Sequence, residues 1–376
     1  MTLAFVTSRL SSAAGGLAAS VPSLANALAR TGGEEVHVLG TRDPQRPGEA
    51  ERWAPHVHAH DARGPAVLHY APDLAKDLAL LRPDVVDVQG LWTWPSHASL
   101  RHHRRTGTPY VVTPRGMLDP WALKNSAWKK RIAWAAFEGA HLRSARALRA
   151  TAEMEAGHFR AIGLRNPIAI VPNGIDIPDL APRPDGPRRA LFLSRIHPKK
   201  GLPLLLRAWK AVEAAHPDWE LIVAGIDEGG HEAEMKALAR ELRIGKIAFT
   251  GPVHGVEKDA LYRSADLFIL PTHAENFGLV VAEALAQEVP VITTRNAPWE
   301  GLRTHRCGWW IELGQPQLEA ALSEAMSKPR AELHAMGARG RAWMARDFGW
   351  DDVAERMRML YAWIVRGASR PDFVQD

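Results

Sequence analysis

The feature of this 376-residue chain that most restricts its fold is a series of short apolar runs that alternate with amphipathic helical segments. One such series runs through each half of the chain. A proline-rich polar stretch at 178–187 separates the two halves. Strands that alternate with helices favour parallel sheets covered by helices on both faces. The chain is also longer than the ~250 residues at which single cores stop growing. The sequence therefore predicts an α/β fold with two doubly wound, Rossmann-like domains.

The individual elements follow from the apolar runs. In the first half we expect strands at 3–7, 35–39, 85–88, 110–113 and 168–171, with helices at 17–30 and 73–81. In the second half we expect strands at 190–194, 220–224, 246–250 and 267–270, with helices at 202–215, 232–242 and 258–264. Residues 350–365 have apolar side chains at helical spacing and predict a closing helix.

Composition restricts the cellular compartment and the kinds of site that the chain can have. The single cysteine, Cys307, excludes an internal disulfide, and no Cys/His zinc pattern occurs. The first residues lack a basic leader, and no apolar run approaches the ~18 residues of a membrane span, so we expect a cytoplasmic protein. Residues 101–150 hold eleven Lys or Arg against two acidic residues, a local charge of +9 in a chain whose total is +5. The basic character is therefore local.

The loops that follow the strands of the second half carry candidate ligand contacts, because ligands bind beyond the carboxyl ends of parallel strands. In LSRIHPKKGL, Arg195, Lys199 and Lys200 follow a strand and precede a helix N-terminus. Cations beside such free N–H groups suit a diphosphate. The alternative is that they are solvated loop residues.

A second loop contains Glu275 and Glu283, eight residues apart in ENFGLVVAE. Eight helical residues advance ~12 Å, which is too far for the paired carboxylates of a glycosidase. The two carboxylates suit opposite ends of a nucleotide sugar, with Glu283 on the ribose and Glu275 near the sugar and phosphate. Helix capping by Glu275 and a solvated Glu283 form the alternative. Asn276, Phe277, Gly278 and Leu279 between them would contact the donor mostly through backbone.

Three glycines are candidates for close approach of backbone to a ligand. Gly225 follows a strand in VAGIDEGG, and a tight turn explains it equally well. Gly15 and Gly16 follow the first strand. The G-x-G-x-x-G spacing is missing there, which disfavours NAD and FAD.

Taken together, E-x7-E at Glu275 and Glu283, LSRIHPKKGL, VPNGIDI and the Gly15-Gly16 loop resemble the family 4 retaining glycosyltransferases over almost the whole chain. The resemblance implies the GT-B fold, with two domains facing a central cleft. The acceptor domain would be 1–180, completed by a C-terminal helix at about 356–376, and the donor domain would be 188–355. It further implies retained anomeric configuration and neutralisation of the leaving diphosphate by Arg195 and Lys200. No metal or cofactor is expected besides the nucleotide diphosphate sugar.

One departure from the family pattern concerns a histidine near the reacting sugar, whose place in VVTPRGM is taken by Arg115. QGLWTWPS and PRGMLDPWALKNSAWKKR resemble a subset that builds exopolysaccharides and capsules, in which Arg115 would be a normal variant. Arg115 would then bind donor sugar, phosphate or an acceptor anion, or lie on the surface. Trp92 and His97 are candidate acceptor contacts.

The basic segment 121–149 interleaves tryptophans with cations and would suit an anionic membrane surface, or a helix with a solvated basic face. Nucleic-acid binding is disfavoured because no reading module is present. His56, His58 and His60 alternate and would share one face of a strand, as an exposed polar edge or a metal site. The sequence thus predicts a peripheral enzyme that transfers a hexose to a glycan or lipid-linked saccharide in a surface-glycan pathway. A nucleotide-sugar epimerase and an inactive membrane-surface scaffold are the alternatives.

Overall fold

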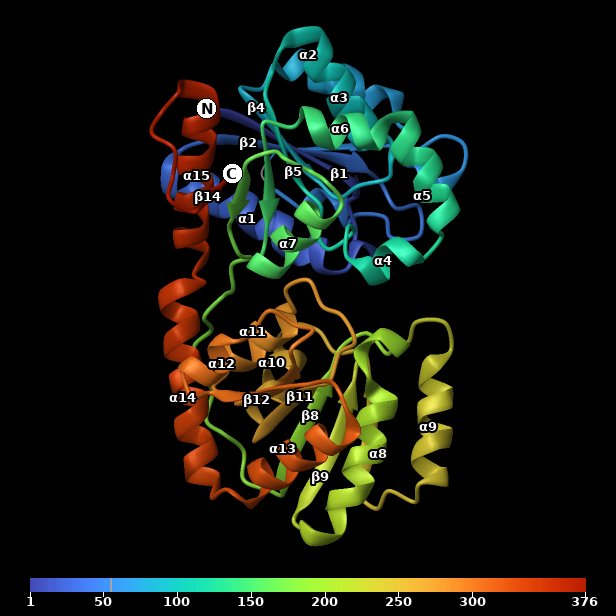
Figure 1. The fold of residues 1–376 in the computed structure, drawn as a ribbon, viewed down its shortest axis with the longest axis vertical. Helices are drawn as coiled ribbons and strands as arrows, with labels where there is room; N and C mark the ends of the chain where they lie inside the picture. Colours follow the sequence, from blue (N-terminus) through green and yellow to red (C-terminus); the bar gives the residue numbers. More distant parts are fainter. Residues whose placement is uncertain (55) are drawn as a thin grey trace. The chain divides into compact units, whose positions relative to one another are not determined.

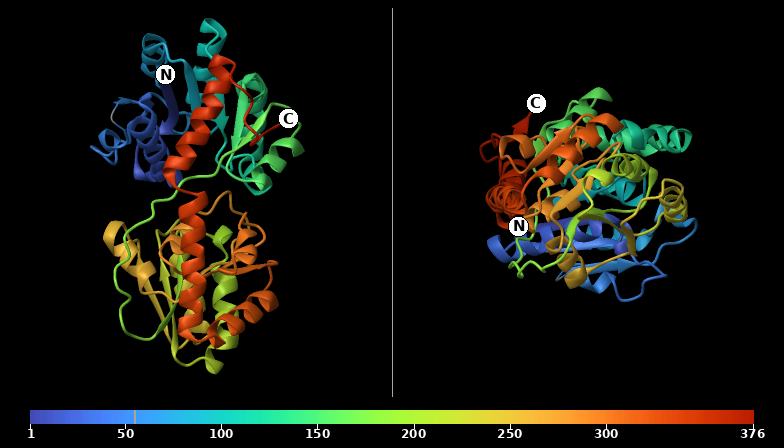
Figure 2. Two further views of the ribbon diagram at one scale, coloured as in Figure 1. Left: turned by 90° about the vertical axis from the view of Figure 1, so that its left-hand side faces the viewer. Right: turned by 90° about the horizontal axis from the view of Figure 1, so that it is seen from below.

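The computed structural model describes residues 1–54 and 56–376 and divides the chain into two compact units. Unit 1 comprises Met1–Gly174 and Trp350–Asp376, and unit 2 comprises Ile175–Gly349 (Figures 1 and 2). The division falls before the proline-rich stretch, which lies within unit 2, and the return to unit 1 starts at Trp350 rather than near 356. Two local contacts fix these positions. Gly174 lies against the Trp350 ring, where a Cβ would come within 2.3 Å of it, and Ile175 forms a β-bridge with Gly349.

Unit 1 contains an eight-stranded sheet in the order β14-β7-β6-β5-β4-β1-β2-β3, parallel except for β14. Its strands are β1 (Thr2–Arg9), β2 (Glu35–Thr41), β3 (His56–His60), β4 (Val85–Gln89), β5 (Tyr110–Thr113), β6 (Ala147–Ala150), β7 (Ile168–Ile170) and β14 (Val374–Gln375). Its main helices are α1 (Gly16–Gly32), α2 (Pro72–Leu81), α3 (Trp94–Thr106), α4 (Pro120–Lys124), α5 (Ala127–Ala133), α6 (Gly139–Ser144), α7 (Glu153–Ala161) and α15 (Trp350–Arg366). A π-helical turn, η4 (Trp134–Glu138), joins α5 to α6.

Two apolar clusters cover the two faces of this sheet. On one face, Leu24 and Leu28 of α1 pack with Met357 and Leu360 of α15. On the other face, α2, α3, α6 and α7 supply buried side chains such as Leu74 and Phe159. Strands covered on both faces are expected to be almost continuously apolar, as Leu3–Val6 of β1 are. The predicted closing helix is therefore α15, and it is part of the core of unit 1 (Figure 1).

Unit 2 contains a six-stranded parallel sheet in the order β10-β9-β8-β11-β12-β13. Its strands are β8 (Arg188–Leu193), β9 (Trp219–Ala224), β10 (Ile247–Gly251), β11 (Leu267–Leu270), β12 (Val291–Thr294) and β13 (Gly308–Ile311). Its main helices are α8 (Leu202–Val212), α9 (His231–Glu241), α10 (Gly255–Arg263), α11 (Leu279–Ala286), α12 (Gly301–Thr304), α13 (Gln315–Ser327) and α14 (Arg330–Asp347). One large apolar cluster, with Trp209, Trp219 and Trp299 buried in it, forms its core.

Each sheet has a point at which the strand order reverses. In unit 1 the chain leaves β1 toward β2 and β3 on one side and later continues through β4 on the other. In unit 2 the same reversal lies between β8 and β11. Crevices for ligands form beyond the carboxyl ends of the strands at such switch points. The loops after β1, β4, β8 and β11 are therefore the places where function is expected.

Candidate functional site

Two loops of unit 2 meet at its switch point and bring Lys200 to Glu275. The Lys200 Nζ lies 2.5 Å from Glu275 Oε2, and the side chains are 9% and 13% exposed. Lys200 follows β8 and Glu275 follows β11. The two residues are 75 positions apart in the chain, and the fold brings them together. A nearly buried ion pair at the carboxyl ends of two central strands is the strongest candidate for a reactive centre in this unit.

Backbone contacts hold these two loops together. The His273 N–H donates to the carbonyl of Lys199 (2.8 Å), and the Thr272 hydroxyl donates to the same carbonyl (3.1 Å). Gly201 has φ +75°, and a Cβ there would come within 2.0 Å of the Pro271 carbonyl oxygen. The loop after β8 therefore requires a glycine at this position to lie against the loop after β11.

The charge of Glu275 is stabilised within this contact. Burial acts to raise the pKa of Glu275, but the Lys200 ammonium and its hydrogen bond outweigh burial, so the pKa is lowered. The other carboxylate oxygen accepts the Asn276 N–H at 3.3 Å. These contacts lie ahead of helix α11, so the structure replaces the helix-cap interpretation of Glu275 with an ion pair.

The turn from Asn276 to Leu279 leads into α11 as the sequence predicts. Gly278 adopts φ +81° at the N-cap, and a glycine cap leaves the first N–H groups of the helix without a side-chain acceptor. The Phe277 ring packs against Trp299 at 5.2 Å between ring centres. The Trp299 indole N–H also donates to the Phe277 carbonyl at 2.5 Å. This aromatic pair fixes the backbone of the turn.

Glu283 forms a separate cluster on α11. Its carboxylate accepts from Lys258 Nζ at 2.8 Å and from the Tyr262 hydroxyl at 2.9 Å. The Glu283 side chain is 21% exposed, so the interpretation as a solvated residue is wrong. Burial, together with the Glu283 carboxylate, raises the pKa of Tyr262, which therefore remains a hydrogen-bond donor. One oriented carboxylate with fixed partners is available for the hydroxyl groups of a ligand.

Arg195 lies apart from Lys200. It is 54% exposed, and its guanidinium pairs with Glu228, in the loop after β9, at 2.6 Å. The structure describes no contact from Arg195 to Lys200 or Glu275, so Arg195 and Lys200 have different surroundings. A ligand phosphate would have to compete with Glu228 for this arginine.

Gly225 is required for packing of backbone on backbone. Its φ is +143°, and a Cβ there would lie 1.7 Å from the Ser194 carbonyl oxygen. The Ser194 N–H also donates to the Ala224 carbonyl at 3.2 Å, which joins the ends of β8 and β9. The close approach at Gly225 is therefore to the residue that follows β8, and its predicted role at a ligand stays a prediction.

Gly225→Ala is expected to lower the free energy of unfolding by about 2–4 kcal/mol, because backbone strain and the clash with Ser194 add. The matched control is Gly230→Ala, where φ is +83° but no atom lies within 4 Å of the added Cβ. The control is expected to cost only about 1 kcal/mol. Urea denaturation of both variants measures the difference, and equal losses would contradict the role assigned to the Ser194 contact.

Gly15 and Gly16 lie where the chain leaves β1 for α1. Gly15 has φ +62° and ψ −129°, a conformation open mainly to glycine, and nothing lies within 4 Å of an added Cβ. Gly16 is the first residue of α1, which has no side-chain cap. An uncapped helix N-terminus beside an open glycine suits an anion, and the contact of Gly15 and Gly16 with the donor stays a prediction.

Arg115 is held in an unusual conformation directly after β5. Its φ is +58°, its Nε donates to Gln89 Oε1 at 2.8 Å, and its Nη1 donates to Asn173 Oδ1. Its Nη2 is buried and has no partner among the described residues. Burial, with the neighbouring Arg149, lowers the pKa of Arg115 to about 9. The surface interpretation of Arg115 is wrong, because its side chain is fixed at the carboxyl ends of β4, β5 and β7.

A buried charge network, which we define as Asp87, Gln89, Arg115, Arg149 and Tyr361, supports this position. Asp87 accepts from Gln89 Nε2 at 2.7 Å and from the Tyr361 hydroxyl of α15 at 2.6 Å. Burial raises the pKa of Asp87, and hydrogen bonds and the two arginines oppose that rise. Arg149 donates to the carbonyls of Val171 (3.0 Å) and Pro172 (2.7 Å). The network joins the terminal helix to the loop that carries Arg115.

Trp92 and His97 lie in aromatic surroundings after β4. Trp92 has φ +71°, and its N–H donates to the fully buried Glu138 at 2.6 Å. Its ring lies 6.5 Å from Trp134, and the Lys130 ammonium is 5.9 Å from it. His97 lies between Trp94 (5.1 Å) and Phe137 (5.7 Å). A strained tryptophan held by a buried carboxylate is a feature typical of functional sites. His97, in contrast, has the contacts of a packing residue.

The basic segment 121–149 does not form one surface. Arg149 is fully buried, so it is excluded from any membrane contact. Trp121, Trp128 and Ile132 are 40%, 64% and 60% exposed on α4 and α5, beside the exposed Lys129. We call Trp121, Lys124, Trp128, Lys129, Arg131 and Ile132 the α4–α5 patch. None of the helices in the described part of the chain has the length and apolar character needed to cross a bilayer.

The three alternating histidines lie on β3, at the edge of the sheet, and His37 of β2 joins them. His37 Nδ1 lies 2.9 Å from His58 Nε2, and the His37 ring stacks on His56 at 5.0 Å. His60 is only 8% exposed, so the row is not wholly an exposed edge. Among residues 1–54 and 56–376, no group of three or more potential ligands could hold a metal ion.

The histidine edge predicts a loss of stability in mild acid. Burial lowers the pKa of both His58 and His60, so their folded pKa lies below the ordinary value of about 6.5. The neutral forms therefore stabilise the fold above about pH 6.5, and this contribution is lost as the pH falls below it. We expect Tm to fall by about 2–4 °C between about pH 7.5 and 5.5 through this edge. In His58→Gln the fall should be smaller, and an unchanged fall would contradict this assignment.

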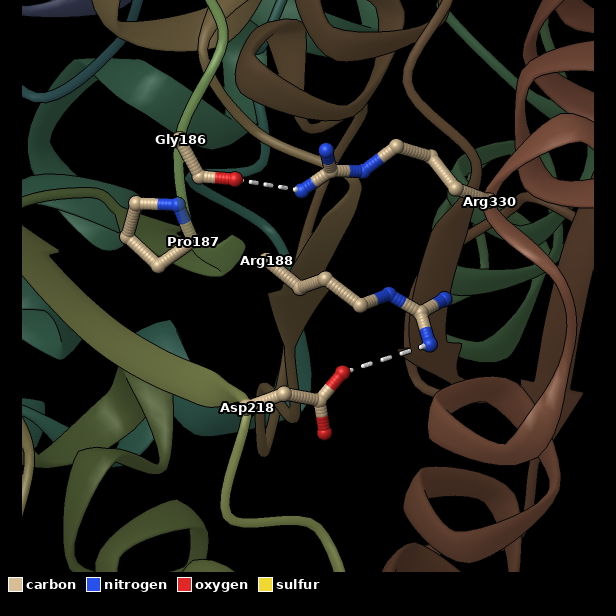
Figure 3. Close-up of a pocket in the computed structure, with 5 residues that line it drawn as sticks. All are labelled: Gly186, Pro187, Arg188, Asp218 and Arg330. Carbon is tan, nitrogen blue, oxygen red and sulfur yellow. Dashed lines mark hydrogen bonds and ion pairs between the residues drawn. The ribbon is translucent and has the colours of Figure 1, made fainter.

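A pocket of about 310 Å³ in unit 2 does not involve the motif residues. Arg188 and Arg330 point into it beside Asp218 (Figure 3). Arg188 lies 3.9 Å from Asp218, and Arg330 lies 2.9 Å from Asp266. The pocket is at the amino ends of β8 and β9, and its cations have acidic partners and carbonyls. Its charges are balanced by the protein, so it does not indicate a ligand.

Several residues of these sites were not predicted from the sequence. Lys258 and Tyr262 orient Glu283, Gly201 allows the two loops to meet, and Asn173 holds Arg115. The glycine in KKGL and the asparagine in VPNG lie inside recognised motifs, so the sequence offers a signal for both as site residues. Lys258 and Tyr262 lie on an ordinary amphipathic helix, where nothing in the sequence distinguishes them.

Comparison with known families supports this arrangement. The family "Glycosyl transferases group 1" matches residues 177–343, and the "Glycosyl transferase 4-like domain" matches residues 15–174. The chain therefore belongs to the glycosyltransferases with the GT-B fold, in family 4. Two of its relatives are a D-inositol 3-phosphate glycosyltransferase of Segniliparus rotundus and a glycogen synthase of Mycobacterium tuberculosis. The first is 28% identical over 58% of this chain and 53% of the relative, and the second is 32% identical over 54% and 50%. The chain thus spans about half the length of these relatives.

Solved structures share the fold. Sucrose-phosphate synthase from Thermosynechococcus elongatus gives a TM-score of 0.81 at 20% identity, over 98% of this chain and 100% of the other. HepE of Anabaena, solved with UDP and glucose, gives 0.78 at 16% identity, over 96% and 99%. WaaG, described as a glycosyltransferase involved in lipopolysaccharide biosynthesis, gives 0.72 at 19% identity, over 97% and 100%.

Proposed function

We propose that this protein transfers a hexose from a nucleoside diphosphate sugar to a glycan or lipid-linked saccharide, with retention of anomeric configuration and without a metal or other cofactor. The observation that carries the proposal is the buried Lys200–Glu275 pair at the switch point of unit 2. Oriented cations and uncapped N–H groups at such a place suit a diphosphate. The match of both halves of the chain to glycosyltransferase families supports the same class of reaction.

In the proposed mechanism, the bond between the anomeric carbon and the diphosphate oxygen breaks, and positive charge develops on the sugar ring. The acceptor hydroxyl oxygen bonds to the anomeric carbon from the same face, and its proton passes to the departing diphosphate. Lys200 would stabilise the negative charge that develops on the leaving diphosphate, and Arg195 would add to this after it leaves Glu228. Glu275 and the backbone from Asn276 to Leu279 would hold the sugar and the phosphates. Glu283, oriented by Lys258 and Tyr262, would accept hydrogen bonds from the ribose hydroxyls.

The acceptor would bind to unit 1. Arg115 would place its unpartnered Nη2 against an anionic oxygen, and Trp92 would contact a sugar ring. We assign the reaction to surface-polysaccharide biosynthesis in the cytoplasm. WaaG, a structural neighbour, is described as acting in lipopolysaccharide biosynthesis, which supports this kind of pathway.

The first test of the proposed donor is a thermal-shift screen against UDP, GDP, ADP and their common sugar conjugates. A ligand that binds the native state raises Tm, by an amount that grows with its concentration relative to Kd. We expect one base to raise Tm, and we expect Glu283→Ala to reduce that rise. No rise with any of the nucleotides would remove the donor assignment and favour an inactive protein.

Peripheral membrane binding through the α4–α5 patch is a further part of the proposal. Exposed Trp121, Trp128 and Ile132 beside cations are typical of helices that rest on anionic lipid. Cosedimentation with vesicles containing phosphatidylglycerol should decrease in Trp128→Ser/Ile132→Ser and at high salt. Equal sedimentation of variant and wild type would contradict a role for the patch.

The comparisons give no support to the epimerase alternative, because the matched relatives are named as transferases and synthases. An assay that separates free sugar from glycosylated acceptor tests this directly. Transfer to an acceptor is the expected result, whereas release of an isomerised free sugar would favour the epimerase.

A further inference from the structure

Unit 1 has a concave surface at the amino ends of β5, β6 and β7. This end of the sheet is opposite to the carboxyl ends of the strands, which carry Trp92 and Arg115. The concave surface encloses about 660 Å³, a volume in the range of small-molecule sites. Its walls include His103, Tyr110, Arg143, Arg146 and Arg165, and none of the described residues that line it is acidic. The loops that carry Trp92 and Arg115 follow the carboxyl ends of strands in the same sheet, so this pocket is separate from the proposed acceptor site.

The positive charge of the pocket comes from three exposed arginines that the concave surface brings together. Some exposed arginines elsewhere pair with acids, as Arg63 does with Asp73 and Arg295 with Glu312, and others, such as Arg101, do not in the described part of the chain. Arg143, Arg146 and Arg165 are exposed, and none of them forms an ion pair among the described residues. The concave surface therefore holds three guanidinium groups whose charge is not neutralised locally.

The backbone that carries these arginines is fixed by other side chains. The Asn166 amide donates to the carbonyls of Leu142 (3.0 Å), Arg143 (3.3 Å) and Ala145 (2.8 Å). The Tyr110 hydroxyl donates to the His141 carbonyl at 2.5 Å, and the Arg146 N–H donates to the Tyr110 carbonyl at 2.9 Å. The carbonyls at the end of α6 are thus satisfied by Asn166 and Tyr110, which leaves the guanidinium groups available to a ligand.

One of these groups is also oriented. The Arg146 guanidinium lies 5.3 Å from the centre of the Trp363 ring of α15. Stacking on an aromatic ring fixes the plane of a guanidinium and leaves its N–H edge available. Guanidinium groups bind phosphate oxygens through paired hydrogen bonds.

We propose that this pocket is a binding site for a phosphate-bearing ligand, with Arg143, Arg146 and Arg165 as its contacts. Both a soluble phosphorylated compound and a phospholipid headgroup present the required oxygens. Cations near the ends of α3 and α6 also stabilise those helices electrostatically. The experiment must therefore detect binding as well as a change in stability.

Titration calorimetry with inorganic pyrophosphate tests the soluble source, and flotation with phosphatidylglycerol vesicles tests the lipid source. We expect Arg143→Gln/Arg165→Gln to weaken one of the two by at least tenfold. Arg101→Gln, which removes an exposed arginine of α3 outside the pocket, should change neither by more than twofold. Loss of pyrophosphate binding assigns a soluble ligand, and loss of vesicle binding alone assigns a headgroup. If the double variant equals wild type in both assays, or if Arg101→Gln loses as much, the proposal is wrong.

The variants are designed to fold. All three replaced side chains are exposed, so we expect Tm to stay within about 2 °C of wild type. Should the double variant unfold, Arg146→Gln alone provides the same comparison. The test does not depend on glycosyl transfer, because both readouts measure binding at a site separate from the proposed donor contacts in unit 2.

Discussion

Lys200→Met is expected to abolish transfer and also to lower the free energy of unfolding by about 3–5 kcal/mol, because removing one partner of a buried pair leaves the other charge uncompensated. Glu275 would then be 13% exposed without its ammonium partner. Loss of a fixed charge that stabilises the leaving group is expected to reduce kcat by about 10²–10³ or more. Urea denaturation and an acceptor assay measure the two effects separately.

A second substitution separates stability from catalysis. Lys200→Met/Glu275→Leu removes both charges, so most of the lost stability should return while transfer stays absent. Arg295→Met is the control, because it breaks an exposed pair with Glu312 and should cost about 0–1 kcal/mol. A Lys200→Met protein with normal stability and turnover would exclude this ion pair from the reactive centre.

Asp87→Asn is expected to be the most damaging single change in unit 1, with a loss of about 3–5 kcal/mol. Asp87 is 1% exposed and is the acceptor for Gln89, Thr113 and Tyr361. Its removal leaves Arg115 and Arg149 with less compensating charge, and it releases Gln89, which holds Arg115. The midpoint of urea unfolding measures the loss.

Two further variants serve as comparisons for the loss of stability in Asp87→Asn. Tyr361→Phe removes only the hydroxyl and should cost about 1.5–3 kcal/mol, the usual range for a hydrogen bond to a charged group. Asp351→Asn breaks the exposed pair between α15 and Arg30, 63% exposed on each side, and should leave the midpoint of urea unfolding almost unchanged. If Asp87→Asn were no worse than Asp351→Asn, the buried network would have no structural importance.

The sequence predicted the fold and the motif positions because both depend on local patterns. Apolar runs fixed β1, β4, β8 and β11, and ligand loops follow strands by a general rule. Glu275 and Lys200 were chosen for that reason, and the structure brings them together. Arg195 shares a motif with Lys200 but pairs with Glu228, because a motif does not specify which neighbouring loop its members contact.

Long-range contacts explain what the sequence did not reveal. Arg115 is held by Gln89 at the end of β4 and by Asn173 in the loop after β7, and Arg149 lies in the core on the buried strand β6. The number of basic residues in segment 121–149 therefore overestimates the positive charge that this segment presents on the surface. The domain boundary was placed a few residues late, because the crossing depends on Trp350 packing on Gly174, a contact between residues far apart in sequence.

The discontinuity of unit 1 has a consequence for the order in which the protein forms during synthesis. Its last helix, α15, leaves the ribosome only after the whole of unit 2 has been made, which takes on the order of 10–35 s at about 5–20 residues per second. Until then the apolar face that includes Leu24 and Leu28 lacks its cover from Met357 and Leu360. Unit 2 is therefore the first part of the nascent chain that can fold completely, and the N-terminal half is the part that requires protection from aggregation.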